Sequence, residues 1–221
     1  MLKIENTEVT GWEAAVRGMR NPMNSWDKID SCSWEISDPF RAYTRVSIGP
    51  SDLGLMKLLR NAGTDHRKFM RMIAVYLDIT APLYWWKEFD TYKVGTVANS
   101  CSTMHKIADK EFVLGDFSCE HLNKETRHLF EQIVNYLNIS RDCYNSAIKD
   151  KDTEWAKDYW WQMIQLLPSS YNQRRTVMLN YEVLANIYKS RRNHKLDEWK
   201  EFCAWIETLP YAELITGEGA K

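Results

Sequence analysis

Apolar and polar positions along the chain alternate with two different periods, and the pattern predicts an α+β protein. Alternation of period two, with β-branched and aromatic residues, predicts strands over residues 2–10, 68–80 and 169–180. Apolar positions three and four residues apart predict helices. The helical segments are residues 11–22, 51–63, 81–92, 128–137, 154–167 and 196–209, and one that follows Asn180 and includes residues 184–191.

Residues that start and stop helices mark the ends of these segments. Pro22 stops the first helix, Ser51 is expected to cap the second, and Gly63 is expected to end it. Asn180 is expected to cap the helix that follows it. Residues 24–50 are polar and aromatic without a clear period, so they are predicted to be irregular.

The composition bounds the class of protein. The chain has 221 residues, 44% of them hydrophobic, which is enough to bury a core, and we expect one domain over residues 1–221. The 29 basic and 30 acidic residues nearly cancel, so charge gives no reason to expect nucleic acid or a membrane surface as a partner. The N-terminal residues form no apolar leader, and Asp78 and Pro82 interrupt the most apolar stretch.

The cysteines and aromatic residues further limit the cellular compartment and the kinds of site that we expect. Five cysteines without a CxxC pair or a zinc-ligand spacing indicate a reducing compartment, so we expect a cytoplasmic protein without a metal site. Ten tryptophans and eleven tyrosines suit either subunit interfaces or a stacking pocket for a planar ligand. The pairs Trp85–Trp86 and Trp160–Trp161 allow a flavin-stacking interpretation, but their helical spacing favours a core or an interface.

The stretch FDTYKVGTVANSCSTMH, from Phe89 to His105, gathers small polar residues, a lone cysteine and a terminal histidine after an apolar, aromatic segment. Within residues 62–101 the chain resembles the flavin-dependent thymidylate synthases. In that family a strand leads into a helix that starts with Ala-Pro and ends in a motif of Arg-His-Arg, seven further residues and a serine.

This chain keeps the spacing of that motif and changes its residues. Ala-Pro stands at residues 81–82. The triplet is Thr91, Tyr92 and Lys93, and after seven residues Cys101 stands in place of the serine. Lys93 therefore keeps the charge of the second arginine and loses its bidentate geometry.

A second segment, residues 167–199, is similar to the family's run from Leu-Pro through a strand to an asparagine-capped helix, a His-containing turn and a Trp-containing helix. The matching positions are held by Asn180, Asn186, Arg191, His194 and Trp199. The family usually has an arginine two residues after the capping asparagine, in its anionic nucleotide site. Here that residue is Glu182.

The resemblance implies a fold, an activity and cofactors. The fold would be an antiparallel sheet packed with helices. The activity would be that of a methyltransferase that uses FAD, reduced by NADPH, to move a methylene group from a folate to dUMP or a related pyrimidine nucleotide and to reduce it. The family's active sites are shared between the subunits of a homotetramer, so we expect a homo-oligomer.

Phosphate groups need fixed cations, because an oxyanion exchanges its hydration for charge-assisted hydrogen bonds. The candidates are Lys93, Arg174, Arg175, Arg191 and Arg192, unless they are solvated surface groups. Arg191 carries over from the family most directly. Arg174 and Arg175 point to opposite faces of a strand, so only one of them is expected to reach a shared pocket.

Amide and imidazole side chains are candidates for contacts to a base or to the flavin. Gln173 and Asn186 each offer a donor and an acceptor, although such amides are more often caps or surface groups. His66 lies near a segment where the family places FAD contacts, although a histidine there is more often an ordinary surface residue. We assign Gln173, Arg174 and Arg191 to the substrate, and His66, Tyr92, Lys93 and Asn186 to the cofactor.

Cys101 is the candidate catalytic residue. In the family the matching serine contacts the uracil, so a cysteine preserves its size or adds thiol reactivity, which His105 and Lys93 can raise if the loop folds around it. The plainer interpretation is a buried, inert cysteine.

Four positions depart from the family where it contacts ligands: Thr91, Tyr92, Cys101 and Glu182. They motivate an alternative, in which the chain keeps the fold and has lost or changed the reaction, so that it binds a nucleotide or a protein partner.

Overall fold

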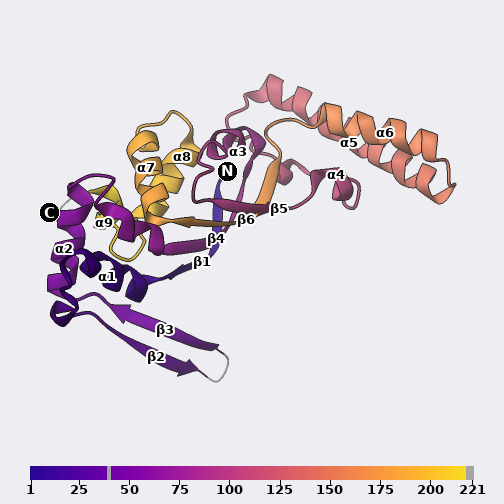
Figure 1. Cartoon of the computed structure of the whole chain (residues 1–221). Helices are drawn as coiled ribbons and strands as arrows, with labels where there is room; N and C mark the ends of the chain where they lie inside the picture. Colours follow the sequence, from indigo (N-terminus) through magenta and orange to yellow (C-terminus); the bar gives the residue numbers. More distant parts are fainter. Residues whose placement is uncertain (39–40, 218–221) are drawn as a thin grey trace. The chain divides into compact units, whose positions relative to one another are not determined.

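A computed structural model gives the fold of residues 1–38 and 41–217 (Figure 1). The chain divides into two compact units, each built from segments far apart in sequence. The first unit comprises Met1–Ile4, Asp78–Thr91 and Asn99–Thr176, and the second comprises Glu5–Leu77, Tyr92–Ala98 and Val177–Lys221. The expectation of one domain over residues 1–221 stays a prediction.

Four strands form an antiparallel sheet in the order β1-β4-β6-β5 (Figure 1). They are β1 (Lys3–Thr10), β4 (Ala74–Pro82), β5 (Val97–Ser100) and β6 (Asn172–Asn180). Alternate positions of the two inner strands are buried, as period-two patterning requires. These residues are Val75, Leu77, Ile79 and Ala81 in β4 and Val177 and Leu179 in β6. The α+β fold, an antiparallel sheet packed with helices, is confirmed.

The helices of the second unit are short. They are α1 (Trp12–Arg20), η1 (Asn21–Met23), η2 (Trp26–Lys28), α2 (Pro50–Asn61), η3 (Arg67–Met72), α7 (Tyr181–Arg191), α8 (Asp197–Glu207) and α9 (Glu213–Thr216). α7 follows β6 directly, and the Asn180 side chain accepts a hydrogen bond from the backbone N–H of Val183 at 3.0 Å. This confirms Asn180 as the N-cap.

A β-hairpin, β2 (Cys32–Asp38) paired with β3 (Arg41–Ser47), also belongs to the second unit. The prediction that residues 24–50 are irregular is therefore wrong. Charged and aromatic residues are mixed along this segment, so its sequence shows no clear period. The pairing of β2 with β3, which periodicity does not record, forms the strands.

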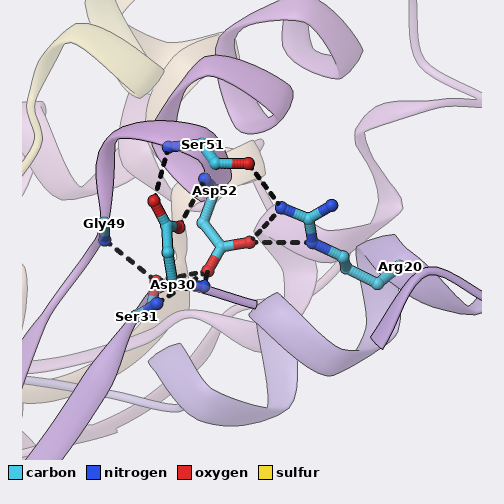
Figure 2. A network of polar contacts seen from close by, with 6 residues as sticks. All are labelled: Arg20, Asp30, Ser31, Gly49, Ser51 and Asp52. Atoms are coloured by element: carbon cyan, nitrogen blue, oxygen red, sulfur yellow. Dashed lines mark hydrogen bonds and ion pairs between the residues drawn. The ribbon is translucent and has the colours of Figure 1, made fainter. Parts of the chain in front are cut away.

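A buried ion pair fixes the base of this hairpin (Figure 2). The carboxylate of Asp52 accepts hydrogen bonds from the guanidinium of Arg20 at 2.8 and 2.6 Å, and from the hydroxyl and backbone N–H of Ser31 at 2.6 and 3.0 Å. Burial raises the pKa of the Asp52 carboxyl, but the hydrogen bonds from Ser31 and Arg20 outweigh it, and the pKa lies below its ordinary value.

The first turn of α2 is capped by a distant residue. The Asp30 carboxylate accepts hydrogen bonds from the backbone N–H groups of Ser51 and Asp52 at 2.8 and 2.9 Å (Figure 2). Gly49 is the N-cap residue, and Ser51 lies inside the helix, so the prediction of Ser51 as the cap is wrong. Pro50 at the first helical position starts the helix one residue earlier.

The first unit is mainly helical. Its helices are α3 (Leu83–Phe89), α4 (Thr103–Lys106), η4 (Leu114–Asp116), α5 (Lys124–Lys149) and α6 (Thr153–Leu166). α5 and α6 lie side by side as a helical hairpin (Figure 1). They pack with the preceding loops around a core of Ile107, Phe112, Phe117, Val134, Leu137 and Met163.

The aromatic pairs divide between core and surface. Trp85 and Trp86 of α3 are fully buried, which confirms them as core residues. Trp160 is partly buried and its indole N–H donates to the Met104 carbonyl oxygen at 2.9 Å, whereas Trp161 is 42% exposed. Within residues 1–38 and 41–217, no helix is both long and apolar enough to cross a membrane.

Two further boundaries differ from the prediction. The strand expected over residues 68–80 begins at Ala74, because the residues before it form η3. The helix expected over residues 81–92 begins at Leu83, because β4 continues through Pro82. The other predicted elements are present, and the helix expected over residues 128–137 is part of the longer α5.

Candidate functional site

Arg191, the last residue of α7, lies between two aromatic rings of the second unit. Its guanidinium carbon is 4.9 Å from the centre of the Trp199 ring and 5.7 Å from that of Tyr92. Its Nε donates a hydrogen bond to the Tyr92 hydroxyl at 3.0 Å. Cation–π contacts and this hydrogen bond fix the plane of the guanidinium, and therefore the directions of its five N–H donors.

Trp199 supports the position of Arg191 and Tyr92 through ring contacts. It is fully buried on α8, and its ring meets the Tyr92 ring edge-on at 6.2 Å and the His194 ring at 6.3 Å. The His194 ring accepts a hydrogen bond from the backbone N–H of Leu196 at 3.2 Å. His194 thus orders the turn between α7 and α8, a structural role that accounts for its position.

The segment that carries Tyr92 packs against the start of α7. Gly95 has φ +78°, and a Cβ at this residue would lie 2.9 Å from the Asn180 amide nitrogen and 3.3 Å from a Val183 methyl carbon. Only glycine combines this backbone conformation with so close an approach. Gly95 therefore fixes the segment at the N-cap of α7, while Lys93 is exposed.

Glu182, on the first turn of α7, binds two arginines. The carboxylate is only 8% exposed, and it accepts hydrogen bonds from Arg67 at 3.3 Å and from both Nε and Nη2 of Arg71. Arg67 also donates to the amide oxygen of Asn186 at 3.1 Å. His66, the residue before η3, is exposed next to this group.

The positive charges of Arg67 and Arg71 stabilise the ionised form of the Glu182 carboxylate. Burial raises the pKa of Glu182, but the hydrogen bond from Arg71 and the charges of Arg71 and Arg67 outweigh it and hold the pKa below its ordinary value. The hydrogen bond with Glu182 also raises the pKa of Arg71. The two arginines are therefore engaged with a carboxylate of the chain itself.

In the first unit, Cys101 follows β5 and its backbone joins β6. The Cys101 N–H donates to the Arg174 carbonyl oxygen at 3.0 Å, and the Gln173 amide donates to the Cys101 carbonyl oxygen at 2.8 Å. The Cys101 side chain is exposed, so the interpretation of a buried cysteine is wrong. β5 is an edge strand with all four residues exposed, which leaves the following residue open to solvent as well.

The two neighbouring arginines of β6 are each paired with a carboxylate. Arg174 binds Asp78 at 2.7 Å, and Arg175 binds Asp90 at 2.8 Å. Arg175 also donates to the Gln173 amide oxygen at 3.0 Å, and its guanidinium carbon lies 4.2 Å from the centre of the Trp86 ring. Arg175 is 15% exposed and Arg174 is 47% exposed. They lie on opposite faces of the strand, as the alternation requires.

The candidate residues thus fall into two groups, one in each unit. The second unit holds His66, Tyr92, Lys93, Asn186 and Arg191, and the first holds Cys101, Gln173 and Arg174. Of these, Tyr92 and Arg191 are in contact, and so are Cys101 and Gln173. Their roles toward a ligand stay predictions.

Several residues that shape these groups have no signal in the sequence. Arg67, Arg71, Asp78 and Asp90 each pair with a candidate position from a different segment. Charged residues scattered over loops and strands show their partners only after folding. The glycine in the middle of the motif, Gly95, was the one available clue to a close backbone approach.

Comparison with known proteins gives solved structures but no sequence relatives. No protein-family profile matches this chain. No curated protein sequence matches it either.

The flavin-dependent thymidylate synthase ThyX from Helicobacter pylori, in a crystal structure with FAD and dUMP, matches 98% of this chain and 98% of its own, with 15% identity and a TM-score of 0.64. A second ThyX structure from the same organism, also with FAD and dUMP, covers 97% of this chain and 98% of its own with the same identity and TM-score. The UMP/dUMP methylase PolB from Streptomyces cacaoi, bound with 5-Br dUMP, covers 99% and 96%, with 14% identity and a TM-score of 0.60.

These matches show that the chain shares the fold of flavin-dependent thymidylate synthases and of a UMP/dUMP methylase over nearly its whole length. They agree with the resemblance seen in residues 62–101 and 167–199. At this level of identity the likeness is one of fold, and the activity has to be argued from the residues themselves.

Proposed function

We propose that this protein binds a pyrimidine nucleotide and FAD and methylates the nucleotide, dUMP or a relative, with a folate as carbon donor and NADPH as reductant. The observation that carries the proposal is the fold match over nearly the whole of both chains to enzymes crystallised with FAD and dUMP or with 5-Br dUMP. The orientation of Arg191 adds to it, because a guanidinium fixed by two rings is a prepared anion ligand.

Among the candidate arginines, Arg191 is better placed than Arg174 and Arg175 to bind the phosphate of a nucleotide. The Arg191 guanidinium is oriented by the Tyr92 and Trp199 rings and by its hydrogen bond to the Tyr92 hydroxyl. Arg174 and Arg175 are bound to Asp78 and Asp90, and would have to exchange these carboxylates for a phosphate. We assign the nucleotide or cofactor phosphate to Arg191, because its guanidinium is held by two rings and because this position carries over from the family most directly.

The chemistry of the proposed reaction is divided between the cofactor and the chain. FAD, when bound, supplies the reducing equivalents. The chain binds and orients: Arg191 holds an oxyanion, and the Asn186 amide, exposed on α7 with its oxygen bound by Arg67, offers its N–H donors to a ring edge. The exposed thiol of Cys101 replaces the family's uracil-contacting serine, and we propose it as a contact to the base.

A second candidate is a protein of this fold that has lost the reaction and keeps nucleotide or partner binding. The group around Glu182 favours it. Where the family has an arginine for the anionic nucleotide site, this chain has a nearly buried carboxylate that neutralises two further arginines. Thr91, Tyr92 and Cys101 also differ from the residues of the family's motif, and these differences likewise favour a lost reaction.

An absorbance spectrum of freshly purified protein separates the two candidates. The first predicts a yellow protein with a flavin spectrum, or a colourless one that binds added FAD and then oxidises NADPH faster when dUMP is present. Protein that neither contains nor binds FAD, yet binds dUMP in calorimetry, would favour the second candidate. No binding of FAD, dUMP or UMP would contradict the first candidate and would limit the second to partner binding.

A further inference from the structure

The helical hairpin of the first unit leaves a band of large apolar side chains in solvent. α5 buries Val134, Leu137 and Ala147, and packs against the shorter helix α6. Beside this buried face, α5 exposes Leu129 by 58%, Tyr136 by 62% and Ile139 by 46%, and α6 exposes Trp155 by 53%. We call this band the outer face of the hairpin. A surface helix usually has one apolar stripe, and α5 has a second one.

The exposed stripe of α5 repeats every seven residues. Its two rows are Leu129, Tyr136 and Cys143, and Gln132, Ile139 and Ser146. Between residues 129 and 146 no position in either row is charged, whereas charged residues, among them Glu125 seven residues before Gln132, occupy much of the remaining exposed surface of α5. Two uncharged rows at this spacing form the seam along which one helix packs on another.

The outer face continues from α5 onto α6. The Tyr159 hydroxyl of α6 contacts the Cys143 thiol of the stripe. Trp155 and Tyr159 contact each other edge-on, with ring centres 5.5 Å apart. A helix that docked along the α5 stripe would therefore also meet these two aromatic rings.

We propose that the outer face binds the same face of a second copy of this chain, with the two α5 helices antiparallel about a two-fold axis. This inference does not rest on the proposed function. It names a surface and a pairing, whereas the expected homo-oligomer above followed only from resemblance.

The spacing of the stripe argues for a second copy as the occupant. In an antiparallel pair, positions of one row meet positions of the other row, and a two-fold axis makes every contact occur twice. Tyr136 then meets Ile139 at the centre, Gln132 meets Cys143, and Leu129 meets Ser146 at the ends. The two apolar residues share the centre, and the large Leu129 faces a small residue, so the seam is complementary to itself.

The available area approaches that of a stable interface. If an aromatic side chain carries about 200 Å², the exposed parts of the outer face supply on the order of 500 Å² of apolar surface per copy. The polar positions around it bring the total toward the ~800 Å² per partner of a standard interface. Depletion of charge at the centre of the face is the composition that such interfaces show.

A matched pair of substitutions tests the proposal. Ile139 and Ile148 are isoleucines of the same helix with similar exposure, 46% and 51%, but Ile148 lies outside both rows of the stripe. Ile139→Glu places two charges near the two-fold axis, so we expect the dissociation constant of the assembly to rise at least tenfold in sedimentation velocity. Ile148→Glu should change it less than twofold.

Circular dichroism of both variants shows whether the helices are intact, so a loss of assembly through misfolding is recognised. If a further interface joins more copies, Ile139→Glu should still reduce the number of copies and Ile148→Glu should not. Equal assembly of the two folded variants would overturn the proposal, and so would a wild-type protein that is monomeric at about 100 μM.

A cysteine pair tests the register. Gln132→Cys should place a thiol opposite Cys143 of the second copy, close enough for a disulfide. Added oxidised glutathione accepts the two electrons and protons and is reduced, and a dimer near twice the 26.1 kDa chain mass should appear on non-reducing gels. Glu131→Cys, one residue away and outside the stripe, is the control, with Cys32 and Cys101 changed to serine in both variants. Equal cross-linking of the two variants would contradict the antiparallel register.

Discussion

Arg191 has the surroundings expected of an anion ligand. Its guanidinium stacks on the fully buried Trp199 and donates a hydrogen bond to Tyr92. These contacts restrict the long side chain before any ligand arrives, so less conformational entropy is lost on binding. Its neighbour Arg192 is exposed and shares the same charge and helix end, which makes the two residues a matched pair.

Arg191→Ala is expected to weaken dUMP or FAD binding roughly 10- to 100-fold, because a charge-assisted hydrogen bond contributes about 1.5–3 kcal/mol. Arg192→Ala should change affinity less than threefold. Isothermal titration calorimetry on both variants measures the difference. Equal losses would mean that neither arginine is a specific phosphate ligand.

Glu182→Gln is expected to lower the free energy of unfolding at pH 7 by about 1–3 kcal/mol, because it leaves Arg67 and Arg71 without their counter-charge. The folded-state pKa of Glu182 is lowered, so its contribution is present above the unfolded-state pKa and is lost as the pH falls through the folded-state pKa. The difference in the free energy of unfolding between variant and wild type should therefore narrow below about pH 4.

Urea unfolding at pH 7, 4 and 3 measures this difference in the free energy of unfolding. Glu131→Gln is the control, since Glu131 forms an exposed pair with Arg127 and should cost less than about 1 kcal/mol. A difference at pH 7 that does not shrink on acidification would show that the carboxylate charge is not the cause.

At the scale of elements, the N-termini of two helices are fixed by specific contacts, most of them from residues distant in sequence. α2 takes its cap from Asp30 and its buried ion pair from Arg20, as Figure 2 shows. α7 takes its cap from Asn180 and is covered at that end by Gly95. Neither α2 contact follows from the local pattern, whereas the α7 cap does.

Asp52→Asn should destabilise the protein by about 3–5 kcal/mol, because it leaves the Arg20 guanidinium, itself 5% exposed, buried without its counter-charge. Differential scanning calorimetry and urea unfolding measure the loss. Asp197→Asn removes an exposed pair with Lys200 and serves as control, with an expected cost below about 1 kcal/mol. A small effect at Asp52 would mean that water reaches Arg20 when the pair is broken.

Gly95→Ala should cost about 1–2 kcal/mol from its left-handed backbone alone. The added methyl group would also press on the Asn180 side chain and disturb the α7 cap. Gly115→Ala is the control, because a Cβ there meets nothing within 4 Å and its φ is not positive. Equal stability of the two variants in urea unfolding would contradict this account of the motif glycine.

The sequence predicted the elements whose patterns are local and missed those that depend on pairing. β6 and the long helices α5 and α6 follow from alternation or helical spacing and are present. The hairpin β2–β3 was missed, because its strands are defined by each other. The Ser51 cap was wrong, because a carboxylate twenty-one residues away supplies the hydrogen bond.

The candidate site was predictable as a set of residues and not as a set of contacts. The spacing of the motif located Tyr92 and Cys101, and the second segment located Arg191. That Tyr92 holds Arg191, and that Arg174 and Arg175 are bound by carboxylates, became visible only with the fold. Periodicity gives the face on which a side chain lies and carries no information about its partner.

At the scale of the whole molecule, the fold match covers 98% of this chain and 98% of the ThyX chain, so the scaffold is present in full. A ligand that binds only the folded state stabilises it by mass action, about 2.7 kcal/mol at a hundred times its dissociation constant. For a chain of 221 residues, each kcal/mol corresponds to about 2–4 °C in Tm. A nucleotide or flavin that uses this scaffold should therefore raise Tm by roughly 5–10 °C.

Differential scanning fluorimetry with dUMP, UMP and FAD, each alone and in pairs, measures this shift. The proposed enzyme should respond to FAD and to dUMP, and the Arg191→Ala variant should need a higher ligand concentration for the same shift, whereas Arg192→Ala should follow the wild type. A shift with a nucleotide and none with FAD would indicate that the fold is kept for nucleotide binding and that Glu182, Tyr92 and Cys101 mark a lost reaction. If no ligand moves Tm at millimolar concentration, the scaffold is not used for these ligands, and the proposed nucleotide methylation is contradicted.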